Sequence, residues 1–196
     1  MVIVKLGGSL YQAAELKHWL TTLRQLSAQQ NIIIVPGGGP FADQVRKAQK
    51  IHDISDSHAH HMAILAMAQF GVLLSGLLPN CQTFSIPSEH IAANHALSIW
   101  LPNKQLLEQP NLAQNWDITS DSLALWLAQQ CQADKLTLIK CNPPKQTTSI
   151  DTLNKMGFID NAFSALASQH AIATELIAAN HYQQFTLDVP VNPLHS

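Results

Sequence analysis

Two clusters of small residues each follow a short apolar run with the composition of a buried strand. The runs are 2–6 and 32–35. The clusters after them are Gly7 and Gly8 with Ser9, and Gly37, Gly38 and Gly39. The carboxyl ends of parallel strands meet at one edge of an α/β sheet, where ligands bind. Glycine lets a backbone approach a phosphate closely, so the clusters predict a phosphate-binding edge; two unrelated tight turns are the alternative.

A lysine, Lys5, lies inside the first apolar run, directly before its glycine cluster. Burying an ammonium group is costly unless an anion compensates for it, and a phosphate is such an anion. A lysine on an edge strand that extends to solvent is the alternative. Lys140 repeats the pattern at the end of the apolar run 136–139. Together the two lysines predict a clamp for phosphate at the same sheet edge.

The familiar phosphate-binding loops are not present. The sequence has no GxxxxGK followed by Ser or Thr, which excludes a P-loop. Gly37 and Gly39 would begin a dinucleotide-binding GxGxxG motif, but Ala42 replaces its third glycine. Pro40 suits the first position of a following helix. A larger side chain at Gly38 is expected to block the close approach of a phosphate to the backbone and to strain a positive φ there as well.

The order of the apolar patterns predicts the elements that position these residues. We expect helices at 16–30, 55–70, 91–95 and 119–130, and strands at 72–78, 82–86, 97–101 and 136–139, with further helices and strands beyond 144. The first strand, helix and strand form a βαβ unit, which requires parallel strands. The sequence therefore predicts an α/β fold, a three-layer sandwich with a mainly parallel central sheet. A loop-rich stretch at 102–115 separates an expected N-terminal lobe, 1–115, from a C-terminal lobe, 116–196, within one continuous fold.

Composition argues against several classes of partner. Of the 196 residues only 12% are charged, and the formal net charge is −2, so we expect no nucleic-acid or anionic-membrane surface. The most apolar stretch, 62–79, is interrupted by polar residues and glycines and is too broken for a membrane span. The three cysteines form no CxxC pair, and the chain opens directly on a strand-like run. These features predict a cytoplasmic protein with reduced thiols.

Three motifs, taken together, resemble the amino-acid-kinase superfamily. They are VKLGGS at 4–9, VPGGGP at 35–40 and TSDSLA at 119–124. The resemblance implies a kinase whose N-terminal lobe holds a phosphate acceptor and whose C-terminal lobe holds ATP. It also implies that Lys5 bridges the transferring phosphoryl group and that Asp121 orients the lysines, with the glycine clusters supplying backbone N–H donors. Mg²⁺ would be carried by the ATP phosphates.

The stretches 55–67 and 116–124 are similar to one branch of that superfamily, the short kinases of tetrahydromethanopterin and methanofuran biosynthesis. That branch converts an aminomethyl-furan-methanol phosphate to its diphosphate. The resemblance implies that the helix from residue 55 lines the acceptor pocket, where Asp56 meets the substrate amine beside His60 and His61. The alternatives are solvated or capping roles for the histidines and a helix-dipole role for Asp56.

Other functions stay open at this point. Many superfamily members carry an acidic, glycine-containing loop after the strand at 136–139, whereas 140–145 contains no carboxylate. One rival function is a kinase for another small phosphate acceptor, such as a nucleoside or isoprenoid monophosphate. A second is a non-catalytic homologue that binds phosphate or nucleotide. The expected partners are ATP and a small-molecule substrate, with a homo-oligomer as a further option.

No metal site is predicted, because His58 and His61 share a helix face without a third ligand.

Overall fold

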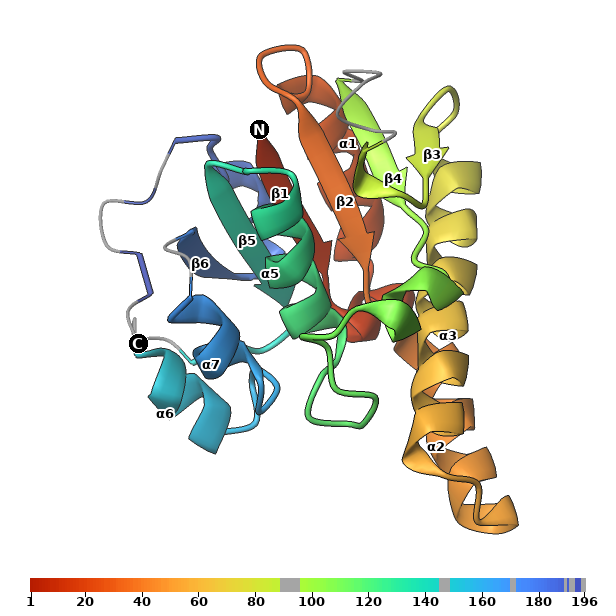
Figure 1. The fold of residues 1–196 in the computed structure, drawn as a ribbon. Helices are drawn as coiled ribbons and strands as arrows, with labels where there is room; N and C mark the ends of the chain where they lie inside the picture. Colours follow the sequence, from red (N-terminus) through yellow and green to blue (C-terminus); the bar gives the residue numbers. More distant parts are fainter. Residues whose placement is uncertain (89–95, 145–148, 170–171, 189, 191–192, 195–196) are drawn as a thin grey trace.

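A parallel sheet forms the centre of the molecule (Figure 1). The computed structural model describes residues 1–88, 96–144, 149–169, 172–188, 190 and 193–194. Within them the strands are β1 (Val2–Leu6), β2 (Ile32–Pro36), β3 (Gln82–Phe84), β4 (Leu97–Trp100), β5 (Lys135–Lys140) and β6 (Ala173–Ala178). Their order is β3-β4-β2-β1-β5-β6, and every described pair is parallel. The predicted α/β fold is confirmed, with a sheet that is parallel throughout its described strands.

Helices cover both faces of this sheet. The α-helices are α1 (Glu15–Leu26), α2 (Gly39–His52), α3 (Asp56–Leu77), α5 (Ser120–Gln130), α6 (Ile150–Lys155) and α7 (Phe163–Ala167). The 3₁₀ helices are η1 (Gly8–Gln12), η2 (Lys104–Glu108) and η3 (Ala179–Gln184). Figure 1 shows α1 on one face of the sheet and α5 on the other, which gives the three expected layers.

The two-residue period of the strands decides which face receives each lysine. Val2 belongs to the core cluster that includes α1, whereas Ile3 belongs to the cluster that includes α5. Lys5 has the same parity as Ile3 and therefore points to the α5 face. In β5, Leu138 lies in the α5 cluster and Lys140 shares its parity. The alternation thus directs both lysines toward α5.

The prediction of a strand at 72–78 is wrong, because α3 continues through this stretch to Leu77. Gly71 separates the predicted helix from the predicted strand, but it lies inside α3. A Cβ atom there would come within 2.4 Å of Leu101 Cδ2 and 3.3 Å of Pro36 Cγ. The missing side chain therefore lets α3 pack closely on the sheet, which outweighs the low helix propensity of glycine.

By length and composition alone, α3 could cross a membrane. Core helices of soluble folds pass the same test. Ile64, Phe70 and Leu74 of this helix are buried in the clusters that pack against the sheet. Packing against the core accounts for only part of its apolar composition, because 39% of the apolar window is buried and Met62, Leu65, Val72 and Leu77 are exposed.

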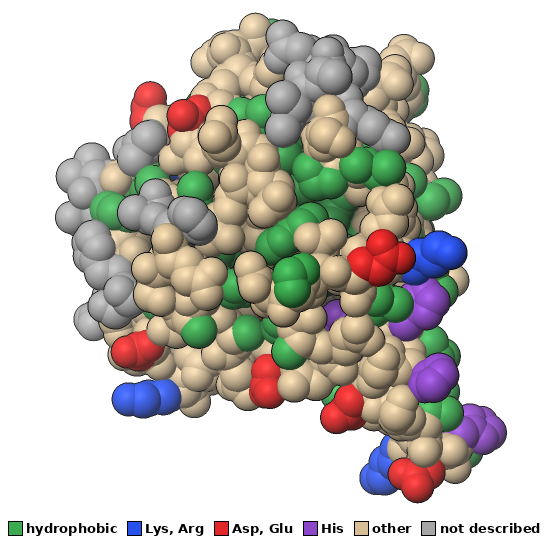
Figure 2. Space-filling model, viewed as in Figure 1, with side chains coloured by type: hydrophobic (Ala, Val, Ile, Leu, Met, Phe, Trp, Pro, Cys, Tyr) green, Lys and Arg blue, Asp and Glu red, His purple; other side chains and the backbone are tan. Residues whose placement is uncertain are grey.

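The remaining sequence predictions have mixed outcomes. The loop-rich stretch 102–115 contains η2, and the predicted helix at 91–95 lies outside the described residues. β1 lies between β2 and β5, so residues before and after position 115 share one sheet. The lobe boundary at 115 stays a prediction. Figure 2 shows charged side chains scattered over the face that carries α5, and histidines gathered over the projecting ends of α2 and α3.

Candidate active site

A carboxylate from α5 joins the two predicted lysines. Lys5 Nζ lies 2.7 Å from Asp121 Oδ1, and Lys140 Nζ lies 2.7 Å from Asp121 Oδ2. Lys5 and Asp121 are buried, and Lys140 is partly exposed. These three residues, called the ion triad below, come from the carboxyl ends of two neighbouring strands and the first turn of a helix. The structure therefore brings together the two lysines that the sequence predicted as a phosphate clamp and the carboxylate that the resemblance expects to orient them.

Burial of the ion triad changes the acid–base properties of its members. Burial lowers the pKa of Lys5 to about 8, and the nearby Asp121 carboxylate only partly opposes this shift. Burial alone would raise the pKa of Asp121, but the charges of Lys5 and Lys140 outweigh it and hold that pKa below its usual value. Two cations thus share one anion, so the triad carries an excess positive charge that suits a bound phosphate.

A second carboxylate, Asp160, caps the helix that carries Asp121. Its Oδ2 accepts hydrogen bonds from Thr119 N (2.8 Å), Thr119 Oγ1 (2.8 Å) and Ser122 N (3.0 Å). Ser122 Oγ donates to its other oxygen. Burial, and then the charge of Asp121, raise the pKa of Asp160, while these hydrogen bonds oppose the rise. Sequence reasoning missed this residue, because a helix cap supplied from 40 positions away leaves no local motif.

We expect Asp160→Ala to destabilise the protein by about 2 kcal/mol, because two backbone N–H groups and two hydroxyls would lose their acceptor. Relief of the buried charge offsets part of this cost. Urea unfolding measures the change. Asp151→Ala is the matched control, since this exposed carboxylate in the first turn of α6 accepts one bond, from Ser164 Oγ. Equal losses in the two variants would show that Asp160 is not the main cap of α5.

The two glycine clusters touch each other. A Cβ atom on Gly8 would lie 2.5 Å from Gly39 N, and one on Gly37 would lie 2.5 Å from Gly8 N. Real Cβ atoms do not approach backbone this closely, so any side chain here would force the loops apart. Glycine is therefore required for the mutual packing of the loops, in addition to any approach of phosphate.

The glycine residues differ in what their backbone can offer a ligand. The N–H groups of Gly7 and Gly37 already donate, to Ile139 O (3.0 Å) and Leu6 O (2.8 Å). Neither glycine lines the cavity of about 490 Å³ that opens beside the two loops. The residues of the clusters that do line it are Gly8, Ser9, Gly38 and Gly39. Backbone donors for phosphate are thus expected from these four, two of which form the start of α2.

The positive φ expected at Gly38 is found one residue later. Gly38 has a φ of −77° and forms the N-cap of α2, whereas Gly39 has a φ of +54°. A Cβ atom on Gly38 would still lie 2.4 Å from Ala42 Cβ. A valine at 38 would therefore clash within the first turn of α2, with no backbone strain from φ.

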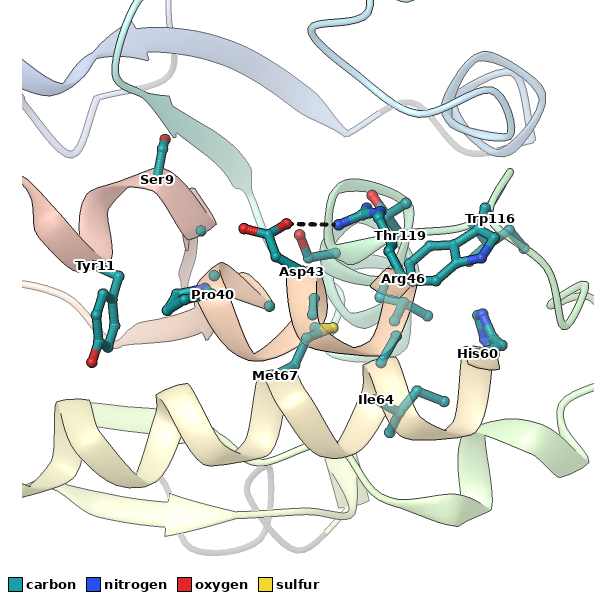
Figure 3. A pocket seen from close by; sticks show the side chains of 18 of the residues that line it. Ser9, Tyr11, Pro40, Asp43, Arg46, His60, Ile64, Met67, Trp116 and Thr119 are labelled. Atoms are coloured by element: carbon teal, nitrogen blue, oxygen red, sulfur yellow. Dashed lines mark hydrogen bonds and ion pairs between the residues drawn. The ribbon is translucent and has the colours of Figure 1, made fainter. Parts of the chain in front are cut away.

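A cavity of about 490 Å³ opens between the glycine loops, α2, α3 and the start of α5. Its apolar wall includes Ile64, Met67 and Leu123. Thr119 and Ser120 line it directly before Asp121, so the start of α5 that carries Asp121 borders the cavity, although Lys5, Asp121 and Lys140 are not among the described residues that line it. Figure 3 shows side chains from α2 and α3 converging on this space. Its volume is at the lower end of the range for small-molecule sites.

Charged and aromatic side chains occupy the α2 side of the cavity. Asp43 Oδ1 lies 3.2 Å from Arg46 Nη1, as the dashed line in Figure 3 shows. The Arg46 guanidinium lies 4.3 Å from the centre of the Trp116 ring. Trp116 Nε1 donates to Gln49 Oε1 at 2.7 Å. Sequence reasoning did not single out Asp43 or Arg46, because an acid and a base three residues apart on a helix are typical of any solvated face.

The three predicted acceptor-site residues on α3 have different positions. His60 is buried and lines the cavity, whereas Asp56 and His61 are not among the residues described as lining it. Asp56 Oδ1 accepts a hydrogen bond from Gln49 Nε2 at 2.8 Å, and Gln49 in turn holds Trp116. The structure therefore connects Asp56 to the cavity wall through another side chain.

The chemical state of His60 follows from its partner. His60 Nδ1 lies 3.1 Å from Asn115 O, and a carbonyl can only accept, so Nδ1 carries the proton. Burial lowers the pKa of His60, which favours the neutral ring. In that tautomer Nε2 is a hydrogen-bond acceptor on a residue of the cavity wall. Among the described residues, no group of three His, Cys, Asp or Glu side chains is placed to hold a metal ion.

The comparisons with known proteins agree on a family and on a fold. The model of the amino acid kinase family matches residues 1–141. A curated relative, (5-(aminomethyl)furan-3-yl)methyl phosphate kinase of Methanocaldococcus jannaschii, is 38% identical over 134 residues. That alignment covers 66% of this chain and 60% of the relative, so the chain matches less than two thirds of the relative's length.

Solved structures with the same fold are more distant in sequence. Uridylate kinase from Archaeoglobus fulgidus superposes with a TM-score of 0.69 at 18% identity, covering 90% of each chain. UMP kinase from Bacillus anthracis gives a TM-score of 0.66 at 14% identity, covering 91% of this chain and 87% of that one. At such identities the likeness establishes the fold alone.

Proposed function

The chain belongs to the amino acid kinase family, and we propose that it transfers the γ-phosphoryl group of ATP to a small phosphorylated acceptor. The observation that carries this proposal is the ion triad, in which Asp121 holds Lys5 and Lys140 beside the two glycine loops. Phosphoryl transfer needs mainly positioning and neutralisation of charge on the transferring oxygens. Two ammonium groups held by one carboxylate supply that charge without reorganisation during the reaction.

We further propose that the acceptor is (5-(aminomethyl)furan-3-yl)methyl phosphate and that the product is its diphosphate. The activity named for the M. jannaschii relative supports this choice, and so does the sequence similarity at 55–67 and 116–124. A cavity of about 490 Å³ with an apolar wall suits a single small ring. A phosphate acceptor is already ionised and needs no strong general base.

The same proposal includes ATP as the phosphoryl donor and Mg²⁺ as the metal ion bound to it. Both oxygens of Asp121 are within 2.7 Å of a lysine ammonium group, so this carboxylate is poorly placed to ligate a metal. A magnesium ion would accordingly be carried by the ATP phosphates, where it neutralises charge on the oxygens. A cytoplasmic location and assembly into a homo-oligomer belong to the proposal as well.

Phosphorus NMR tests the proposed reaction directly. Incubation of the protein with Mg-ATP and the furan phosphate should give ADP and the resonances of a new diphosphate. A parallel panel contains UMP and isopentenyl phosphate, which represent the rival monophosphate acceptors. Faster conversion of either rival would replace the proposed acceptor. Binding of ATP by calorimetry without phosphorylation of any panel member would instead support a non-catalytic homologue.

A further inference from the structure

The charged side chains on the described cavity wall are few and are of both signs. Among the described residues that line the cavity, Asp43 is the single acidic residue, and Arg46 is the single residue that is either lysine or arginine. The two lie side by side on α2 (Figure 3). The remaining described wall is apolar, aromatic, backbone or neutral polar. A ligand that carries both a phosphate and an ammonium group would match this pair in charge.

The Asp43–Arg46 ion pair can open at little cost. Both side chains are more than half exposed, and exposed ion pairs contribute little to stability. Arg46 also has a second partner, the Trp116 ring at 4.3 Å. Asp43 can therefore turn toward a ligand without leaving the guanidinium group alone.

We propose that Asp43 recognises the ammonium group of the acceptor and so makes the site selective for phosphorylated amines. This inference rests on the proposed function and replaces Asp56, which the sequence indicated for the same role. Asp56 is engaged by Gln49 and does not line the described cavity. His60 Nε2 provides a second acceptor on the wall, and a neutral imidazole next to an ammonium group carries no repulsion.

The selectivity follows from the charge of the amine. A hydroxyl and an ammonium group can both donate a hydrogen bond to the Asp43 carboxylate, but only the ammonium group adds an attraction between opposite charges. An acceptor with a hydroxyl in place of the amine has nearly the same shape but no charge. With that analogue Asp43 keeps only its exposed ion pair with Arg46.

The experiment compares (5-(aminomethyl)furan-3-yl)methyl phosphate with its hydroxymethyl analogue. For the wild-type protein we expect kcat/KM to favour the amine by at least tenfold. In Asp43→Asn this ratio should fall to within about threefold, with the loss in KM and with kcat nearly unchanged, as for an interaction made equally in ground and transition states. Asp53→Asn, which removes an exposed charge at the far end of the same helix, is the matched control and should keep the wild-type ratio.

Calorimetric binding of both compounds without ATP separates this inference from the proposed function. If the amine is phosphorylated but Asp43→Asn leaves the ratio of the two kcat/KM values unchanged, the role of Asp43 is refuted and the proposed reaction is not. If Asp56→Asn removes the preference for the amine and Asp43→Asn does not, the role of Asp43 is also refuted, and Asp56 takes its place. Binding that prefers the amine and depends on Asp43, without turnover, would support the inference and refute the proposed reaction. Absence of binding for both compounds, together with turnover of neither in the presence of Mg-ATP, would refute both.

Discussion

Lys5→Met is expected to lower kcat by on the order of 10³ or more while the protein stays folded. The substitution keeps most of the side-chain volume and removes the ammonium group from the proposed site of transfer. Asp121 keeps its partner Lys140, so no uncompensated buried anion is left. We therefore expect the free energy of unfolding to change by less than about 2 kcal/mol. Removal of one partner from a buried ion pair typically costs about 3–5 kcal/mol. Steady-state kinetics and urea unfolding on one preparation measure both quantities.

Lys135→Met is the matched control for this prediction. Lys135 is equally buried, at 1% exposure, but its Nζ lies 2.7 Å from Glu175 and donates to Thr186 O and Asp188 O. This variant should lose about 2 kcal/mol of stability, because two carbonyls and a carboxylate lose a donor, while kcat of the folded protein persists. A Lys5→Met protein that behaved in the same way would place Lys5 among structural lysines and remove it from the proposed mechanism.

The lowered pKa of Lys5 gives the same prediction a pH dependence. With a pKa of about 8, Lys5 loses its proton as the pH rises through 8, so kcat/KM should fall above this value. The free energy of unfolding should change in the opposite direction from kcat/KM. Between about pH 8 and the ordinary lysine pKa of 10.5 the unfolded chain binds more protons than the folded one, so the unfolding free energy rises with pH. Lys5→Met should abolish that rise.

Asp121→Asn is expected to lower kcat by on the order of 10² or more. The amide keeps the shape of the carboxylate and can still occupy the first turn of a helix, but it no longer balances the charges of Lys5 and Lys140. Asp121 is buried, so loss of its charge should also destabilise the protein by about 3 kcal/mol, well above the value for an exposed helix-dipole charge. A urea melt and steady-state kinetics at a temperature where the variant is fully folded separate the two effects.

The pH profile distinguishes electrostatic orientation from simple support of the fold. The Asp121 charge raises the pKa of Lys5 against the effect of burial. Removing that charge should lower the Lys5 pKa further, so the alkaline limb of the profile should move to lower pH in Asp121→Asn. Near-normal kcat with an unmoved limb and a lowered melting midpoint would show that Asp121 serves only the start of α5.

Sequence patterns predicted the parts of the site that depend on the alternation of side chains along a strand. Lys5 and Lys140 interrupt apolar runs, and alternation in a strand is enough to place both on one face. Asp121 was identified through the resemblance of its motif, and the structure gives it a physical partner on each oxygen. Periodicity could not decide between helix and strand in the apolar stretch after Gly71, where the glycine serves close packing inside a helix.

Residues that act across long sequence separations were not predictable in this way. Asp160 caps α5 from a different segment, and no spacing rule connects the two. Asp43 and Arg46 have an ordinary helical spacing, and only the cavity beside them distinguishes them from other surface charges. His60 differs from its neighbours His58 and His61 through burial, which depends on how α3 packs against the segment around Asn115.

The central place of β1 in the sheet also governs the order in which the chain can assemble during synthesis. Val2 pairs with Ile32 on one side and with Lys135 on the other. The pairing with β2 can form early, but the opposite side of β1 stays an open edge until β5 has left the ribosome. For much of that interval Lys5 has no carboxylate partner, because Asp121 also lies late in the chain. A nascent chain stalled before residue 135 should accordingly remain sensitive to protease, and release of the last two strands should convert it to a resistant form in one step.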